Sequence, residues 1–90
     1  MKIRKHIRFY GSVQGVGFRY HAEYAANSVG ASGWVRNEYD GSVSMEIQGT
    51  PEQTDSVLSM LGKGRYIQID YMEVKETEPD EGERGFRVLY

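Results

Sequence analysis

A chain of 90 residues has room for one small domain with a modest core and a single shallow site. Its hydrophobic fraction of 39% and charged fraction of 27% are typical of a soluble globular protein and exclude a disordered chain. The formal net charge of −2 argues against a dedicated binder of the nucleic-acid backbone, and the absence of cysteine excludes disulfides, cysteine nucleophiles and thiolate metal sites.

The spacing of apolar and turn-forming residues predicts seven elements. In chain order they are a strand at 2–10, a helix at 18–29, strands at 33–37 and 43–47, a helix that begins at Pro51 and ends at Gly62, a strand at 67–75 and a short last strand at 86–90. Alternation of apolar and polar residues predicts the first strand. An apolar stripe that starts at Phe18 predicts the first helix, and Gly30 is its expected C-cap.

Two turn signals fix the middle of the chain. Asp40 and Gly41 predict a tight hairpin turn, in which the glycine supplies a positive φ. Thr50 is the expected N-cap of the second helix, with Pro51 in its first turn and Gln53 completing a capping box. These signals place a hairpin directly before the second helix.

The first six elements follow the order strand, helix, strand, strand, helix, strand, which predicts an α+β protein. The short last strand is the seventh element and ends the chain. We expect a ferredoxin-like βαββαβ sandwich, an antiparallel sheet with two helices on one face, formed by residues 1–90 as a single domain. This fold serves enzymes, metal carriers and binding modules, so it does not decide the function.

Charge is uneven at the two ends of the chain. Residues 2–8 are rich in Lys and Arg, and residues 76–83 are rich in Asp and Glu. We expect two solvated strand ends that attract each other weakly; a basic docking patch for an anionic partner is the alternative. The start of the chain lacks the apolar core of a signal peptide, which favours a cytoplasmic location, and no segment is apolar enough to span a membrane.

The most informative stretch is the loop from Gly11 to Gly17, which joins a strand to a helix. Three glycines allow successive backbone N–H groups to point inward, and the helix N-terminus adds partial positive charge. Arg19 follows in the first helical turn, where its guanidinium can bind two phosphate oxygens. The loop matches neither a Walker A sequence nor a dinucleotide fingerprint. A simple connection and a phosphate site are both consistent with this pattern.

Several separated motifs carry a resemblance to a known family. Residues 13–19 (VQGVGFR), 33–37 (GWVRN) and 40–43 (DGSV) resemble acylphosphatase, and the similarity extends over nearly the whole chain to 85–88 (GFRV). This family hydrolyses acyl phosphates to a carboxylate and inorganic phosphate without a metal or cofactor. The resemblance therefore implies a hydrolase with no metal site and no cofactor.

The resemblance also implies roles for particular residues. Arg19 and the loop amides would hold the phosphate, and Asn37 would position the attacking water. The implied phosphate-binding loop consists of Ser12, Val13, Gln14, Gly15 and Val16. The position after Gly11 is often basic in this family and is Ser12 here, which would weaken the attraction for phosphate slightly and leave the amides in place.

The chemistry agrees with such a sparse site. The leaving carboxylate has a conjugate acid with a pKa of about 4, so it departs without a general acid. Amides and a guanidinium can stabilise the charge that spreads over the phosphoryl oxygens. An asparagine amide can accept a hydrogen bond from water and orient it.

Other side chains have weaker functional signals. His6 is expected to be exposed, His21 points away from Arg19, and the two histidines match no zinc spacing. Tyr20, Trp34 and Tyr39 are candidates to line a substrate pocket. We expect a monomer that acts on a small acyl phosphate and binds no nucleic acid; the alternative is a non-catalytic phosphate- or RNA-binding ferredoxin-like module.

Overall fold

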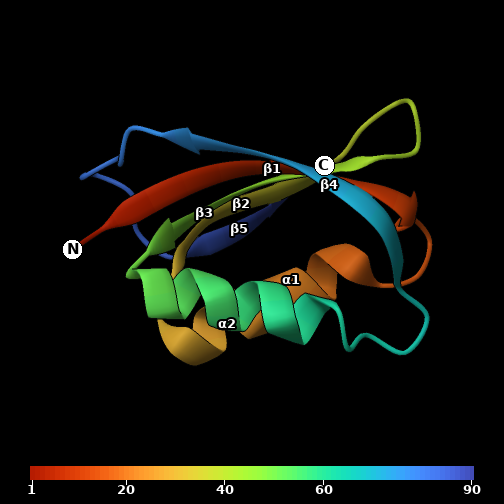
Figure 1. Cartoon of the computed structure of the whole chain (residues 1–90), viewed down its shortest axis with the longest axis horizontal. Coiled ribbons are helices and arrows are strands. Elements are labelled where there is room, and N and C mark those ends of the chain that lie inside the picture. Colours follow the sequence, from red (N-terminus) through yellow and green to blue (C-terminus); the bar gives the residue numbers. More distant parts are fainter.

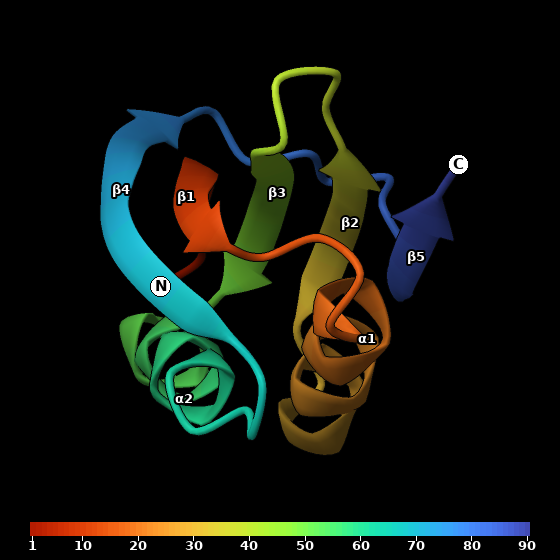
Figure 2. The ribbon, with the colours of Figure 1, turned by 90° about the vertical axis from the view of Figure 1, so that its right-hand side faces the viewer.

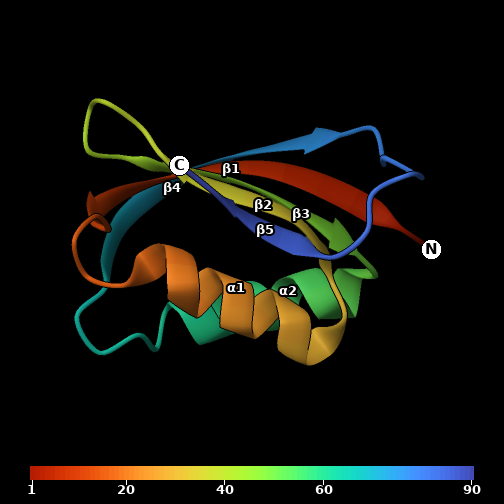
Figure 3. The same cartoon turned by 180° about the vertical axis from the view of Figure 1, so that it is seen from behind.

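A five-stranded sheet carries both helices on one of its faces (Figure 1; Figure 3 shows the same layers from behind). The computed structural model describes all residues from 1 to 90. In chain order the elements are β1 (Ile3–Ser12), α1 (Phe18–Val29), β2 (Ser32–Asn37), β3 (Val43–Gly49), α2 (Pro51–Leu61), β4 (Gln68–Thr77) and β5 (Phe86–Leu89). The predicted order of elements and the ferredoxin-like sandwich are confirmed. Neither helix is both long enough and apolar enough to cross a membrane.

The strands lie in the order β4-β1-β3-β2-β5. The pairs β4–β1, β1–β3 and β3–β2 are antiparallel, as expected. The expected antiparallel sheet is formed by these four strands, and β5 adds to it in parallel with β2, with Phe86 opposite Gly33. The reason is the path of residues 78–85, which carry the chain from β4 at one edge to β5 at the other edge (Figure 2).

The core lies between the helices and the sheet. Phe9 of β1 and Phe18 of α1 pack at its centre, with ring centroids 4.9 Å apart. Alanines form most of the buried stripe of α1, namely Ala22, Ala25 and Ala26, so this helix approaches the sheet closely. Because Phe18 is fully buried at the first turn of α1, the start of this helix is fixed against the sheet.

The helix ends follow the predicted capping signals. Thr50 accepts a hydrogen bond from the backbone N–H of Gln53, whose side chain in turn accepts from the backbone N–H of Thr50. Gly30 ends α1 in the left-handed region, at a φ of 76°. Both helices therefore begin and end where the sequence places them.

The charged segments at the two ends of the chain are not solvated as expected. Arg4 is only 5% exposed, because residues 78–85 lie across the helix-free face of the sheet. Its Nη1 and Nη2 atoms donate to the two carboxylate oxygens of Glu83 at 2.8 and 3.1 Å, and its Nε donates to Glu46 at 2.6 Å. The bond to Glu83 raises the pKa of Arg4 even further. By contrast, Lys2 and Glu81 form an exposed ion pair, consistent with the weak attraction expected between the two segments.

His6 is also less exposed than predicted. Its Nδ1 lies 2.9 Å from the second carboxylate oxygen of Glu46, and its ring meets the ring of Trp34 edge-on at 5.9 Å. Glu46 thus contacts two basic side chains of β1, Arg4 and His6. Burial alone would raise the pKa of Glu46, but the hydrogen bonds from these two residues outweigh burial and lower it.

Replacement of Arg4 by alanine is expected to lower the free energy of unfolding by about 3–5 kcal/mol, because Glu83 would be left buried without a partner. Urea unfolding followed by circular dichroism measures this change. Arg87→Ala, at an exposed position of β5, is the control and should cost well under about 1 kcal/mol. Equal losses in the two variants would contradict the role given to Arg4.

The lowered pKa of Glu46 also predicts how stability depends on pH. A carboxyl with a lower pKa in the folded chain stabilises it above the unfolded value of about 4.5. This contribution is lost as the pH falls through the folded value. Unfolding measured from pH 7 down to pH 3 should therefore show a shallower loss of stability in Glu46→Gln than in the wild type. Identical slopes would mean that Glu46 does not couple to folding.

Candidate functional site

Three segments meet at one end of the sheet. The loop 13–17 leaves β1, crosses the end of β3 and enters α1 beside β2 (Figure 2). Asn37 is the last residue of β2, and Tyr90 directly follows β5. Because β5 pairs with β2 in parallel, the ends of these two strands lie at the same end of the sheet as the loop.

A hollow of about 210 Å³ lies where these segments meet. It brings together four of the predicted site residues, Val13, Gly15, Arg19 and Asn37. The remaining residues of its wall are Gly17, Phe18 and Tyr20. Its size suits a small anion or a few water molecules.

Three predicted loop residues do not line this hollow. Ser12 is the last residue of β1 and is paired with Gln68 of β4. The side chain of Gln14 points to the hairpin between β2 and β3, where it donates hydrogen bonds to the backbone. Val16 packs partly against the core. Of the loop, Val13, Gly15 and Gly17 line the hollow.

The loop backbone has free hydrogen-bond donors. None of the backbone hydrogen bonds outside the helices and strands has its donor in residues 13–17. Unpaired N–H groups are costly unless water or a ligand accepts from them. The helix α1 begins without a side-chain cap and without an acidic residue in its first turn, so no side chain there offsets the positive end of its dipole.

Sequence reasoning missed Gly17, which lines the hollow and is the N-cap of α1. Gly15 and Gly17 have φ values of 73° and 79°, in the region that favours glycine. A Cβ at either position would meet no atom within 4 Å, so the backbone conformation and not lack of space requires glycine. The signal for Gly17 was its place as the last glycine before the helix.

Arg19 carries a charge that no carboxylate neutralises. Its Nη1 donates to the carbonyl of Leu89 at 3.3 Å, and its guanidinium lies 5.0 Å from the centre of the Tyr90 ring. Tyr90 is held by a hydroxyl contact of 2.9 Å with Tyr20, which raises the pKa of Tyr90. The ion pairs of the chain do not include Arg19. Its positive charge is therefore available to an anion in the hollow.

Asn37 contributes an unsatisfied acceptor. Its side-chain Oδ1 is buried and has no hydrogen-bond partner. Such a group costs about 1–3 kcal/mol of stability relative to a satisfied one. Its backbone position is fixed, because Asn37 is opposite Val43 in the β2–β3 ladder. The fold thus holds this carboxamide oxygen at the edge of the hollow, and no donor of the chain binds it.

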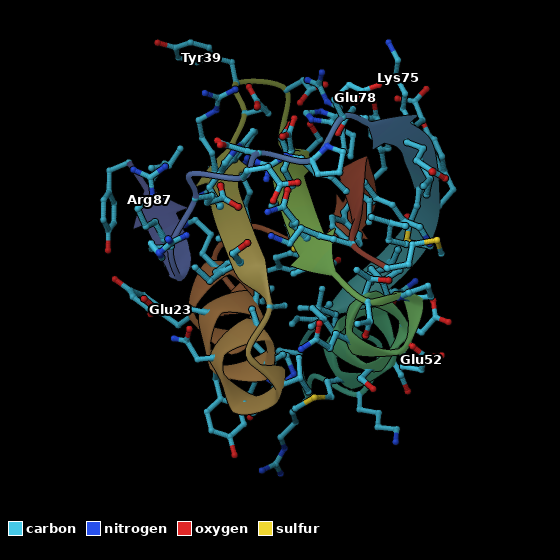
Figure 4. The ribbon with its side chains drawn as sticks, turned by 90° about the vertical axis from the view of Figure 1, so that its left-hand side faces the viewer. Glu23, Tyr39, Glu52, Lys75, Glu78 and Arg87 are labelled. Atoms are coloured by element: carbon cyan, nitrogen blue, oxygen red, sulfur yellow. The ribbon has the colours of Figure 1, made fainter.

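A second hollow of about 500 Å³ shares Asn37 with the first. Its wall consists of Arg36, Asn37, Glu38, Tyr39 and Tyr90. Of the aromatic candidates from the sequence, Tyr39 lines this hollow and projects from the hairpin (Figure 4), whereas Tyr20 lines the first. Trp34 lines neither hollow, because its ring contacts His6 and the guanidinium of Arg36.

The two histidines lie away from the first hollow. His21 is half-buried, with Nε2 2.8 Å from the carbonyl of Met60 in α2, so it points away from Arg19 as predicted. His6 contacts Glu46 on the helix-free face. No three side chains of His, Asp or Glu lie together as a metal site would require. Residues 15–20, which superficially resemble an aromatic RNA-binding motif, form a loop and the start of a helix and not a central strand.

Comparison with known proteins agrees with the geometry. Residues 5–88 match the family model of acylphosphatase. An acylphosphatase of Thermococcus kodakarensis is 42% identical over 89 residues, covering 98% of this chain and 97% of the relative. One from Oceanobacillus iheyensis is 45% identical over 82 residues, covering 89% and 90%. The crystal structure of acylphosphatase from Bacillus subtilis superposes with a TM-score of 0.90 at 30% identity, covering 98% of this chain and 99% of that one. The chain belongs to the acylphosphatase family, and it is an acyl-phosphate hydrolase.

Proposed function

We propose that the chain cleaves an acyl phosphate into a carboxylate and inorganic phosphate within the smaller hollow. The backbone amides of residues 12–16 and the guanidinium of Arg19 hold the phosphate, and the amide of Asn37 orients the attacking water. The observation that carries the proposal is the unpaired Oδ1 of Asn37 beside a charge that no carboxylate neutralises.

Phosphate binding is supported by the hydrogen-bond donors of the loop and of Arg19. The loop amides form none of the turn and loop hydrogen bonds, and Arg19 lies in the first turn of α1. Amides at a helix N-terminus favour an anion, and a guanidinium adds two strong hydrogen bonds to phosphate oxygens. Because Leu89 and Tyr90 hold Arg19 in place, little side-chain freedom is lost when phosphate binds.

The water-orienting role is supported by the acceptor at Asn37. A carboxamide oxygen can accept a hydrogen bond from water, but it is a poor base, so its contribution is placement. Attack in line with the leaving group requires the water to lie at a fixed position relative to phosphorus. A strand end paired with its neighbour on β3 provides such a position.

The reaction needs no further group from the chain. The carboxylate leaves without protonation, because its conjugate acid has a pKa of about 4. Charge on the phosphoryl oxygens is stabilised by the amides and by the guanidinium of Arg19. The proposal therefore assigns no metal, cofactor or covalent intermediate to this site.

The proposal extends to the setting in which the enzyme works. We infer a monomer of one domain, residues 1–90, that acts in the cytoplasm on a small acyl phosphate and not on nucleic acid. A net charge of −2 and the absence of cysteine support this setting. Light scattering of the purified chain measures the oligomeric state directly.

Asn37→Ala is expected to lower kcat for benzoyl phosphate by about 100-fold or more, because the attacking water loses its fixed position. The assay contains excess chelator and no added metal. Inorganic phosphate should still inhibit the variant with nearly the wild-type constant, since Arg19 and the loop remain. Asn27→Ala, at an exposed position of α1, is the matched control and should keep full activity. Full activity of Asn37→Ala would refute the assignment.

Arg19→Ala should weaken the binding of inorganic phosphate about 10- to 100-fold, the effect of losing a charged hydrogen-bond donor. The inhibition constant of phosphate against benzoyl phosphate hydrolysis measures this change, and calorimetry replaces it where turnover is too slow. Arg87→Ala removes the same charge from an exposed position and should leave the constant unchanged. If both variants bind phosphate like the wild type, the guanidinium of Arg19 does not contact it.

A further inference from the structure

The side chain of Gln14 connects the phosphate loop to the hairpin that follows Asn37. Its Nε2 donates to the carbonyl of Glu38 at 2.7 Å and to the carbonyl of Ser42 at 2.8 Å. These are the only side-chain hydrogen bonds between the loop 13–17 and the hairpin residues 38–42. One carboxamide group therefore spans the two segments that hold the phosphate and the water.

The hairpin carbonyls are fixed targets for this amide. The carbonyl of Ser42 also accepts from the backbone N–H of Glu38 at 2.9 Å, which closes the hairpin. The hydroxyl of Ser42 accepts from Arg8 Nε at 2.8 Å and donates to Asp40. Since Glu38 directly follows Asn37, a hydrogen bond to the carbonyl of Glu38 fixes the loop relative to the strand end that carries Asn37.

The loop itself has little else to fix it against Asn37. Val13 anchors one end of the loop in the core, and Phe18 anchors the start of α1. Between them lie Gly15 and Gly17, where even a Cβ would meet no atom within 4 Å, and Val16, which packs only partly against the core. Without the Gln14 bonds, the amides of the loop could shift relative to the end of β2.

We propose that Gln14 is a positioning residue, which sets the distance between bound phosphate and the water on Asn37 through its two donated hydrogen bonds. This role rests on the proposed function and adds to it, because the side chain of Gln14 does not line the hollow. A displacement of about 1 Å between reacting groups can slow a reaction by up to 100-fold. The effect falls on kcat and not on phosphate affinity, because the binding groups stay within the loop and on Arg19.

The donor character of Gln14 gives a sharp test. Gln14→Glu keeps the shape of the side chain but presents oxygens to two carbonyl oxygens. Gln14→Ala removes the bonds without adding repulsion. The matched control is Gln53→Glu, because Gln53 Nε2 likewise donates to a backbone carbonyl, that of Val29 at 2.7 Å, far from the site.

In both Gln14 variants kcat for benzoyl phosphate is expected to fall about 10- to 100-fold. The inhibition constant of inorganic phosphate should stay within about threefold of the wild type, on the argument that the amides and Arg19 still bind it. Gln53→Glu should keep the wild-type kcat. Circular dichroism and urea unfolding show that each variant is folded.

The pH dependence of Gln14→Glu separates positioning from simple loss of structure. A glutamic acid ionises with a pKa of about 4.3 in water, and two facing carbonyls would raise it. Once protonated, it can donate one of the two lost bonds. The ratio of its kcat to that of the wild type should therefore rise about threefold or more between pH 7 and pH 4.5. The ratio for Gln14→Ala should stay flat.

Dividing by the wild-type kcat at each pH removes the pH dependence that the two proteins share, and the nearby charged groups are the same in both. They are Glu38 and Asp40 of the hairpin, Arg8 of β1 and Arg36 of β2. A hydrogen bond from Ser44 holds the pKa of Glu38 below its usual value, and one from Ser42 does so for Asp40. Both hairpin carboxylates therefore remain ionised over most of the range measured.

Each other outcome overturns a stated part of the inference. Wild-type kcat in both Gln14 variants overturns the positioning role while leaving the proposed function intact. Gln14 would have a structural role instead if the inhibition constant of phosphate rose in step with the loss of kcat, or if both Gln14 variants failed to fold. The same conclusion would follow if the kcat ratio of Gln14→Glu did not change with pH, or if Gln53→Glu lost as much kcat. A wild type that does not hydrolyse benzoyl phosphate overturns the proposed function itself, and the role of Gln14 with it.

Discussion

The chain has to cross the end of β3 to pass from β1 to α1, because β3 is paired between β1 and β2 (Figure 2). A crossing segment cannot join the ladder of the strand below it, so its backbone N–H groups lack partners in the sheet. The same crossing brings the segment beside the end of β2, where Asn37 lies. The position of β3 in the sheet therefore brings the unpaired amides of the loop close to the carboxamide of Asn37. Because Phe18 is buried, the start of α1 is held at the same place.

The two faces of the sheet are covered in different ways, one by apolar packing and the other by ion pairs. The face under the helices is apolar, and its packing fixes α1 and with it Arg19. The opposite face is covered by residues 78–85, where Arg4 satisfies two carboxylates at once. Arg4 is fully paired and Arg19 has no carboxylate partner, although both are arginines in a chain with an excess of acidic residues. The position of each arginine in the fold, and not the overall charge of the chain, decides whether it stabilises the structure or is available to a ligand.

The sequence predicts elements with local signals well and long-range paths poorly. The ends of both helices are found because Thr50, Gln53 and Gly30 signal them directly. The parallel direction of β5 is not found, because alternation indicates which face is buried but not which strand lies beside it. The paired state of Arg4 depends on the same path and was missed for the same reason. In the site, the sequence motif predicts that Asn37 lies at the end of a strand. The direction of the Gln14 side chain follows only from the position of the hairpin.

The pairing of β1 with β4 joins residues that are far apart in sequence, with Arg4 opposite Thr77 and Ser12 opposite Gln68. Such contacts form only after a long stretch of chain has closed into a loop, whose entropy is lost before the contacts can compensate for it. Folding should accordingly take about milliseconds to seconds, far slower than for a helical bundle of this length. A newly made chain then passes through a period in which β4 has no partner strand. Pairing with β1 satisfies one side of β4 only, because β4 is the edge strand of the sheet, and its residues Tyr71, Met72 and Val74 stay exposed in the folded chain.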